Sequence, residues 1–255
     1  MNNGHQSTGE ASRRCVVSDR IRLAAPRESA LGKKIWIISD THEKHGALIV
    51  PEVDAVIHCG DEANSSQPEK NLPESMRFFE WYSSLPIERK LFVPGNHSTA
   101  ISRGWVAPDM YQSVEFLIHQ EADLFGLSVF GSPWAPSMPW QNPWVYTKKR
   151  DKMHAVWESL PDGIDLLVTH GPAKGILDMV GSMVAGKGFV CVGCASLAKW
   201  IDRHRPAIHA FGHIHDDKGV KNYGTFTRDG TTSINASVCD HRYEPVHGGF
   251  VVDLV

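Results

Sequence analysis

Short apolar runs recur along the chain after residue 33, and polar residues follow each of them. The runs are short and several are rich in β-branched residues, which predicts buried strands rather than helices. The five runs are KIWIIS, DAVIHCGD, KLFVPGNH, IDLLVTHGP and PAIHAFGHIH, and the polar residues at or after their ends are Asp40, His42, Asp61, Asn96, His97, His170, His213 and His215. We therefore expect these polar side chains to gather where the strands end.

Helical patterns lie between the runs. Apolar positions three or four apart predict amphipathic helices over 72–85 and 194–205, and a less regular pattern predicts a third over 146–160. The C-terminal stretches 231–240 and 248–255 return to strand-like sequence. This order predicts an α/β protein with two stacked mixed β-sheets flanked by helices. In open α/β sheets, sites form at the carboxyl ends of the strands, where the polar residues fall.

The first part of the chain has a different composition. Residues 1–32 show no hydrophobic period, and we expect a flexible N-terminal extension. Residues 33–255 carry all the predicted strands and helices and are expected to form one domain, because the sequence shows no repeat and no second set of elements.

Charge and cysteine content narrow the possible partners and location. The net charge of -3 and the pI near 6.5 give no reason to expect nucleic acid or a membrane surface as a partner. An odd count of five cysteines argues against a secreted disulfide framework, and the polar N-terminus lacks the apolar run of a signal peptide. We expect a cytoplasmic protein, and the sequence carries no signal for its oligomeric state.

The polar residues form a set suited to metal binding. Seven oxygen and nitrogen donors (the eight residues without His97) exceed what one ion needs. Carboxylate, imidazole and amide ligands suit Mn, Fe, Zn or Co rather than a thiolate-selecting metal. A carboxylate can bridge two ions about 3.5–4 Å apart, the spacing of two-metal hydrolases. His213 and His215 lie two residues apart, so in an extended segment both would point to one face.

The ordered motifs DTH, GD, GNH, THG and GHIH resemble those of the calcineurin-like metallophosphoesterases, over roughly residues 34–240. The stretches GSPW, THGPAKGILD, VGC and INASVCD are further similar to the small metallophosphoesterase-domain branch, which is related to class III cyclic nucleotide phosphodiesterases. The resemblance implies an αββα sandwich and a binuclear metal centre.

The resemblance also implies a role for each site residue. Two divalent ions would bind, with Mn or mixed Fe and Mn favoured among Mn, Fe, Zn, Co and Mg. His97 would bind the substrate phosphate and act as general acid or electrostatic partner for the leaving oxygen. Asp61 would bridge the two ions. The implied ligands are Asp40, His42 and His215 for one ion and Asn96, His170 and His213 for the other.

Two positions depart from the usual family pattern. Ser98 follows Asn96-His97 where an acid is usual, so the support of His97 is expected to come from elsewhere. Glu62-Ala63 follows Asp61 in place of an apolar and then a polar residue. Neither change removes a ligand, so both concern substrate preference and rate.

Three tryptophans lie among prolines in SPWAPSMPWQNPW. Prolines disfavour a regular strand or helix here, so the stretch is either a core-packing segment or a rigid aromatic loop at the rim of the cleft. In the second case Trp140 and Trp144 would bind an aromatic part of the substrate.

Together these patterns predict a metal-dependent phosphodiesterase that acts on a small-molecule phosphoester. Cyclic nucleotides or other small phosphodiesters are the expected substrates, cleaved by attack of a metal-bound hydroxide. Two alternatives stay open: a phosphomonoesterase with the same centre, and a catalytically silent binding protein on this fold.

Overall fold

One six-stranded sheet joins segments from both ends of the chain. The computed structural model describes residues 16–138, 144–182 and 188–255. β2 (Lys34–Ile38), β3 (Ala55–His58), β4 (Arg89–Phe92) and β5 (Glu115–Phe116) run parallel, whereas β16 (Phe250–Leu254) lies antiparallel to β2. In spatial order the strands are β1 (Asp19–Leu23), β16, β2, β3, β4 and β5.

A second six-stranded sheet is built from the middle of the chain. Its four central strands run parallel, and the two outer strands pair antiparallel to their neighbours. In spatial order they are β14 (Gly224–Arg228), β15 (Thr231–Asn235), β13 (Ile208–Phe211), β10 (Leu166–Thr169), β7 (Leu127–Ser132) and β6 (Gln120–Leu124). Both sheets are mixed, as the sequence predicts.

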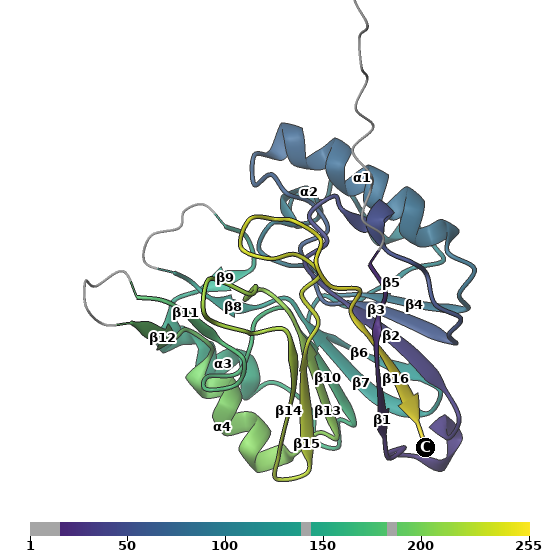
Figure 1. The fold of residues 1–255 in the computed structure, drawn as a ribbon, viewed down its shortest axis with the longest axis vertical. Coiled ribbons are helices and arrows are strands. Elements are labelled where there is room, and N and C mark those ends of the chain that lie inside the picture. Colours follow the sequence, from purple (N-terminus) through teal and green to yellow (C-terminus); the bar gives the residue numbers. More distant parts are fainter. Residues whose placement is uncertain (1–15, 139–143, 183–187) are drawn as a thin grey trace, which may run out of the picture.

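The two sheets stack, and helices cover their outer faces (Figure 1). Ile35 and Ile57 from the first sheet pack with Leu166 and Val168 from the second in one buried cluster. The alternate residues of β2 and β3, such as Trp36, point outward to the helical layer. Both faces of these strands are therefore buried, which explains why the runs are continuously apolar.

The helices lie near the predicted positions. α1 (Pro68–Ser84) packs on the first sheet, and α4 (Ala195–His204) packs on the second. The third predicted helix is shorter than expected: only α3 (Met153–Trp157), preceded by a 3-10 turn, is helical. α2 (Thr99–Ser102) is a single turn after β4. With two mixed sheets and helices on both outer faces, the predicted fold class is confirmed.

Residues 16–32 differ from the flexible extension expected for 1–32. The segment DRIRL forms β1, which pairs in parallel with all five residues of β16. The Asp19 carboxylate also accepts a hydrogen bond of 2.8 Å from the Tyr223 hydroxyl. The expectation of flexibility is therefore wrong for this part. Only two apolar residues, Ile21 and Leu23, alternate with the charged ones in this edge strand, and so short an alternation is easily overlooked beside the continuous apolar runs of the central strands.

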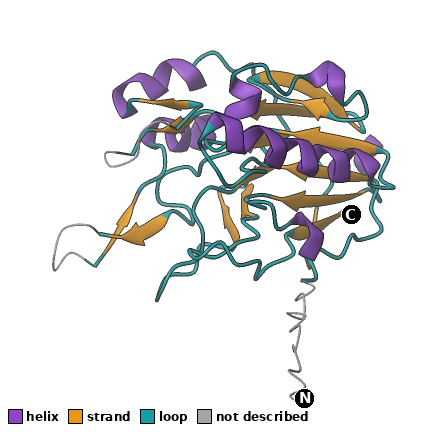
Figure 2. Cartoon of the chain, turned by 90° about the horizontal axis from the view of Figure 1, so that it is seen from above, coloured by secondary structure: helices purple, strands orange, loops and turns teal. Residues whose placement is uncertain are grey.

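Two short ribbons stand apart from the main sheets. β8 (Ala135–Pro136) pairs with β9 (Thr147–Lys148), and β11 (Met179–Gly181) pairs with β12 (Phe189–Cys191). The β11–β12 ribbon projects to one side of the main sheets (Figure 1 and Figure 2). Among the described helices, none is both long and apolar enough to cross a bilayer.

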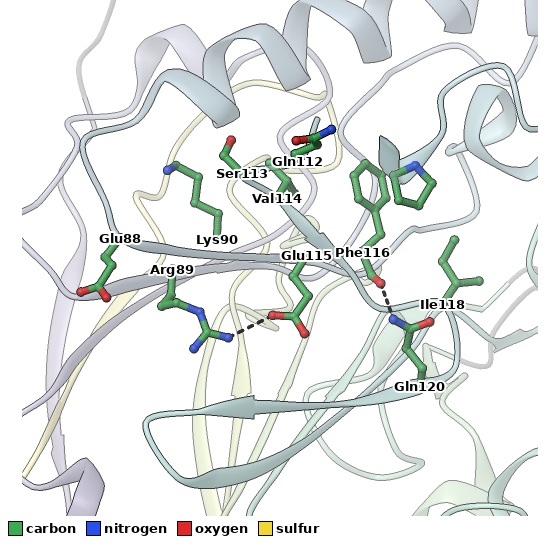
Figure 3. Close-up of a pocket in the computed structure, with 11 residues that line it drawn as sticks. Glu88, Arg89, Lys90, Gln112, Ser113, Val114, Glu115, Phe116, Ile118 and Gln120 are labelled. Atoms are coloured by element: carbon green, nitrogen blue, oxygen red, sulfur yellow. Dashed lines mark hydrogen bonds and ion pairs between the residues drawn. The ribbon is translucent and has the colours of Figure 1, made fainter. Parts of the chain in front are cut away.

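A surface groove of about 600 Å³ lies where β5 ends the first sheet (Figure 3). Arg89 and Glu115 form an ion pair of 3.0 Å in it, and Gln120 donates a hydrogen bond of 2.8 Å to the Phe116 carbonyl. The groove is bounded by residues at the amino end of β4. It therefore lies at the other end of this strand from Asn96 and His97, which follow the carboxyl end.

Candidate metal centre

The loops after five parallel strands meet in one cleft of about 340 Å³. β2, β3 and β4 contribute from the first sheet, and β10 and β13 contribute from the second. The structure brings together all eight polar residues that follow the apolar runs of the sequence. Six of them line the cleft directly, namely His42, Asp61, Asn96, His97, His213 and His215.

One group of candidate ligands contains Asp40, His42 and His215. One ligand atom from each residue lies within 4.8 Å of the others. The Nε2 atom of His215 is 3.2 Å from Asp40 Oδ1, and the Nε2 atom of His42 is 3.9 Å from the same oxygen. Three donors facing one small volume could hold a metal ion.

A second group contains Asp61, His170 and His213, with ligand atoms again within 4.8 Å of one another. Asn96 adjoins this group, because its Oδ1 is 2.8 Å from His170 Nε2. The same nitrogen lies 3.3 Å from Asp61 Oδ2. The second group and the adjoining Asn96 together include all three residues that the resemblance implies for the second ion, and Asp61 as well.

Backbone carbonyls orient three of the imidazoles. Nδ1 of His42, His170 and His215 lies 3.0, 2.9 and 2.9 Å from the carbonyl oxygens of Ala63, Cys59 and Asp240. Each contact favours a proton on Nδ1 and leaves the lone pair on Nε2 for a metal, the usual arrangement around metal-bound histidine.

Two buried nitrogen atoms test whether a metal fits. Nε2 of His42 and Nε2 of His213 have no hydrogen-bond partner among the described residues. Buried polar atoms without a partner are rare and costly in folded proteins. A divalent ion in each group would coordinate these two nitrogens, so the residues present fit a pair of metal ions.

The electrostatics of the cluster favour bound positive charge. Burial would raise the pKa of Asp40, but the hydrogen bond and charge of His215 hold it below its ordinary range. Burial also lowers the pKa values of His42 and His213 to about 3, which keeps both imidazoles neutral. Burial would lower the pKa of His170, yet the charge of Asp61 raises it to about 9. The ionised carboxylates and the neutral imidazoles of His42 and His213 are suited to binding divalent cations, whereas His170 would have to release a proton to bind one.

The backbone of the site is held in an uncommon conformation. Asp40, His42, Asp61 and His213 have φ values of 53°, 39°, 59° and 70°, in the left-handed region. Such conformations cost energy in residues other than glycine and concentrate at functional sites. His213 and His215 do not lie in an extended segment, since β13 ends at residue 211 and the backbone turns after it. That turn puts the two imidazoles in different groups.

The turn before His213 requires a glycine at position 212. A Cβ atom at this position would overlap the Asp40 carboxylate and the Ser39 side chain. The missing side chain lets the backbone amide of His213 approach and donate a hydrogen bond of 2.8 Å to Asp40 Oδ2.

His97 sits beside both groups without belonging to either. Its Nδ1 lies 2.7 Å from the Asn64 carbonyl, which leaves Nε2 as the nitrogen for a bound phosphate. Its backbone amide donates a hydrogen bond of 2.7 Å to Asp61 Oδ1. Asn71 of α1 donates a hydrogen bond of 2.6 Å to the His97 carbonyl. The support expected from elsewhere thus comes from Asn64 and Asn71, which the sequence analysis did not identify.

The unusual pair Glu62 and Ser98 is explained by one contact. The Ser98 hydroxyl donates a hydrogen bond of 2.6 Å to Glu62, and Ser75 of α1 donates another of 2.6 Å to the same carboxylate. Burial raises the pKa of Glu62, which is fully enclosed. In the usual family pattern the acid is at position 98. Here the acid is at position 62 instead, and Glu62 contacts the same loop through Ser98.

Two aromatic residues border the cleft. The Trp144 ring lies 5.5 Å from the His97 ring and 5.8 Å from the His213 ring. Tyr243, which the sequence analysis did not identify, lies 4.6 Å from the His42 ring. Trp144 thus lies at the rim of the cleft, whereas Trp134 stacks with Lys148 outside it. Trp140 lies outside the described residues.

The structure has two stacked mixed sheets, with two candidate metal-binding groups where the carboxyl ends of strands from both sheets meet. Such a fold and site are those of a metal-dependent phosphoesterase. The chain belongs to the calcineurin-like phosphoesterase family, whose model matches residues 33–217. The resemblance found in the sequence motifs is thereby confirmed.

Relatives and solved structures agree with this assignment. Metallophosphoesterase domain-containing protein 1 of Homo sapiens is 33% identical over 243 residues, which cover 85% of this chain and 69% of that protein. A UPF0046 protein of Caenorhabditis elegans is 30% identical and covers 85% of this chain and 79% of its own. Phosphopantetheinyl hydrolase from Mycobacterium tuberculosis superposes with a TM-score of 0.55 over 88% of this chain and 96% of its own. At 15% identity, the last likeness shows the fold alone.

Proposed function

We propose that the protein is a phosphodiesterase for cyclic nucleotides or other small phosphodiesters. The observation that carries the proposal is the position of His97. Its Nδ1 is held by the Asn64 carbonyl, and its ring lies 5.1 Å from the His42 ring of the first group. Its amide donates to Asp61 of the second group, and Trp144 lies beside its ring. A phosphate bound between the groups would have an imidazole and an aromatic surface next to its ester oxygen.

Each group has a distinct part in the proposed reaction. When bound, two divalent ions supply the Lewis acidity and charge neutralisation for phosphoester hydrolysis. Asp40, His42 and His215 would hold one ion, and Asn96, His170 and His213 would hold the other. Asp61 would be shared, because its Oδ2 faces His170 of the second group and its backbone carbonyl accepts the amide of His42 of the first. His97 Nε2 would give a proton or positive charge to the leaving oxygen.

The donor set limits which metals fit. The two groups contain carboxylate, imidazole and amide donors and, among the described residues, no thiolate. Such mixed oxygen and nitrogen sites suit Mn, Fe, Zn or Co, and among these we propose manganese, or iron with manganese, as the native pair.

The four cysteines in the described part of the chain are free thiols. Free thiols persist in reducing compartments and are uncommon in secreted proteins. This supports the cytoplasm as the proposed location.

A substrate panel tests the function. Metal-depleted protein is reconstituted with Mn, Fe, Zn, Co or Mg and assayed with cyclic nucleotides, aryl diesters and aryl monoesters. We expect the highest kcat/KM on a diester. A clear preference for monoesters would assign the same centre to a phosphomonoesterase. Metal binding without hydrolysis of any substrate would indicate a binding protein on this fold.

A further inference from the structure

Two aromatic rings border the cleft next to different metal groups. Tyr243 contacts the first group, with ring centroids 4.6 Å from His42 and 5.5 Å from His215. Trp144 contacts the second group at His213 and also contacts His97. Both rings line the cleft, so a substrate phosphate held between the groups would have one aromatic surface near each ion.

The position of Tyr243 is fixed by a tight turn rather than by chance packing. The Asp240 carboxylate accepts hydrogen bonds from the amides of Arg242 (2.8 Å) and Glu244 (3.1 Å), and the Tyr243 amide bonds to the Asp240 carbonyl at 2.9 Å. Tyr243 has a φ of 60°, a costly value for an aromatic residue. Strained residues held by their surroundings are frequent where a side chain must meet a ligand.

The same turn also reaches the metal group. The Asp240 carbonyl that accepts the Tyr243 amide is the acceptor for Nδ1 of His215. The Tyr243 ring is nevertheless 38% exposed and faces the cleft. The exposed surface is available for an apolar part of the substrate.

The two rings face different parts of a diester. His97 is the residue proposed to assist the leaving oxygen, and Trp144 lies beside His97. The leaving group would therefore lie on the Trp144 side. A diester carries a second organic group, which stays on the phosphorus and which a monoester lacks. The Tyr243 side of the cleft remains for that retained group.

We propose that Tyr243 is a specificity-determining residue that binds the retained substituent of the substrate and favours diesters in which this substituent is a planar aromatic ring. The inference rests on the proposed phosphodiesterase function and adds which side of the cleft selects the diester. Ring-to-ring contact supplies the selectivity, so the hydroxyl of Tyr243 is not needed for it.

Three substrates with one leaving group test this inference. Bis(4-nitrophenyl) phosphate, methyl 4-nitrophenyl phosphate and 4-nitrophenyl phosphate all release nitrophenolate and differ only in an aryl, a methyl or no retained group. In Tyr243→Ala, the ratio of kcat/KM for the bis-aryl over the methyl diester should fall about threefold to tenfold, the range of one aromatic contact. Tyr243→Phe should keep the wild-type ratio.

Two further variants separate selectivity from damage. Phe226→Ala removes an aromatic ring of similar exposure (42%) on β14 and should leave the ratio unchanged. Trp144→Ala should lower kcat/KM for all three substrates by the same factor, since their leaving group is the same. Partial loss of metal in any variant scales the three rates together and cancels from the ratio.

The outcomes separate failure of the proposed Tyr243 role from failure of the proposed phosphodiesterase function. If the wild-type protein hydrolyses no diester, the proposed function is wrong. If it hydrolyses diesters and Tyr243→Ala lowers all three rates by one factor, Tyr243 only supports His42, and the specificity role is refuted.

Discussion

Replacing His97 by alanine removes one imidazole while leaving its backbone contacts in place. The amide of residue 97 would still donate to Asp61, and its carbonyl would still accept the hydrogen bond from Asn71. The side chain itself makes one hydrogen bond, to the Asn64 carbonyl, so its loss should lower the free energy of unfolding by only about 1 kcal/mol. Metal content should therefore stay close to that of the wild-type protein.

The rate should respond according to the leaving group. A ribose alkoxide is a strong base and needs a proton as it departs, whereas nitrophenolate departs readily without one. With a cyclic nucleotide, His97→Ala should lose roughly 10²–10⁴-fold in kcat, the range for a positioned general acid. With an aryl diester the loss should be much smaller. Steady-state rates on both substrates, with elemental analysis of the same samples, measure this difference.

His45 offers a matched control. It lies three residues after His42, but its ring packs against Phe78 and Trp81 on the helical side of the first sheet. His45→Ala should change the rates on both substrates by the same factor. Equal losses in His97→Ala would instead assign His97 to phosphate positioning, and a fall in its metal content would make it a ligand or the support of one.

Three further predictions concern the metals, the rim and the buried acid. Asp61→Ala should lose metal at both positions by elemental analysis, and wild-type protein that binds at most one Mn ion after reconstitution would exclude a binuclear centre. Trp144→Ala should raise KM for substrates with an aromatic leaving group more than it changes kcat, and a loss of stability alone would make this ring a packing residue. Glu62→Ala should lower the free energy of unfolding in a denaturant titration by about 2–4 kcal/mol, because two buried serine hydroxyls lose their acceptor. An unchanged denaturation midpoint would show that this network adds nothing to stability.

The fold was predictable because strand burial leaves a plain trace in sequence. β2, β3 and β4 are covered on both faces, so their apolar runs are continuous and their ends are marked by the first polar residues. β1 could not be found in this way, since this edge strand carries only two alternating apolar residues, Ile21 and Leu23, and no continuous apolar run.

The candidate site was predictable in its ligands and less so in its surroundings. Asp40, His170 and the other metal-binding types are recognisable by chemistry and order along the chain. The Asn64 carbonyl that holds His97 is a backbone atom, so residue type carries no record of it. Tyr243 reaches the cleft through the shape of a turn more than 20 residues after His215, and only three-dimensional packing reveals that proximity.

The origin of the ligands in two different sheets has a consequence for folding. Asp40 and Asp61 follow strands of the first sheet, whereas His170 and His213 follow strands of the second. A chain with only one sheet formed has at most part of either group and cannot hold the ions tightly. Bound metal would thus act as a non-covalent cross-link between the two halves of the sandwich, and it would favour the native state over any partly assembled one. Metal affinity then becomes a direct measure of how well the two sheets are docked. Substitutions at buried positions between the sheets should therefore lower metal affinity even though they change no ligand.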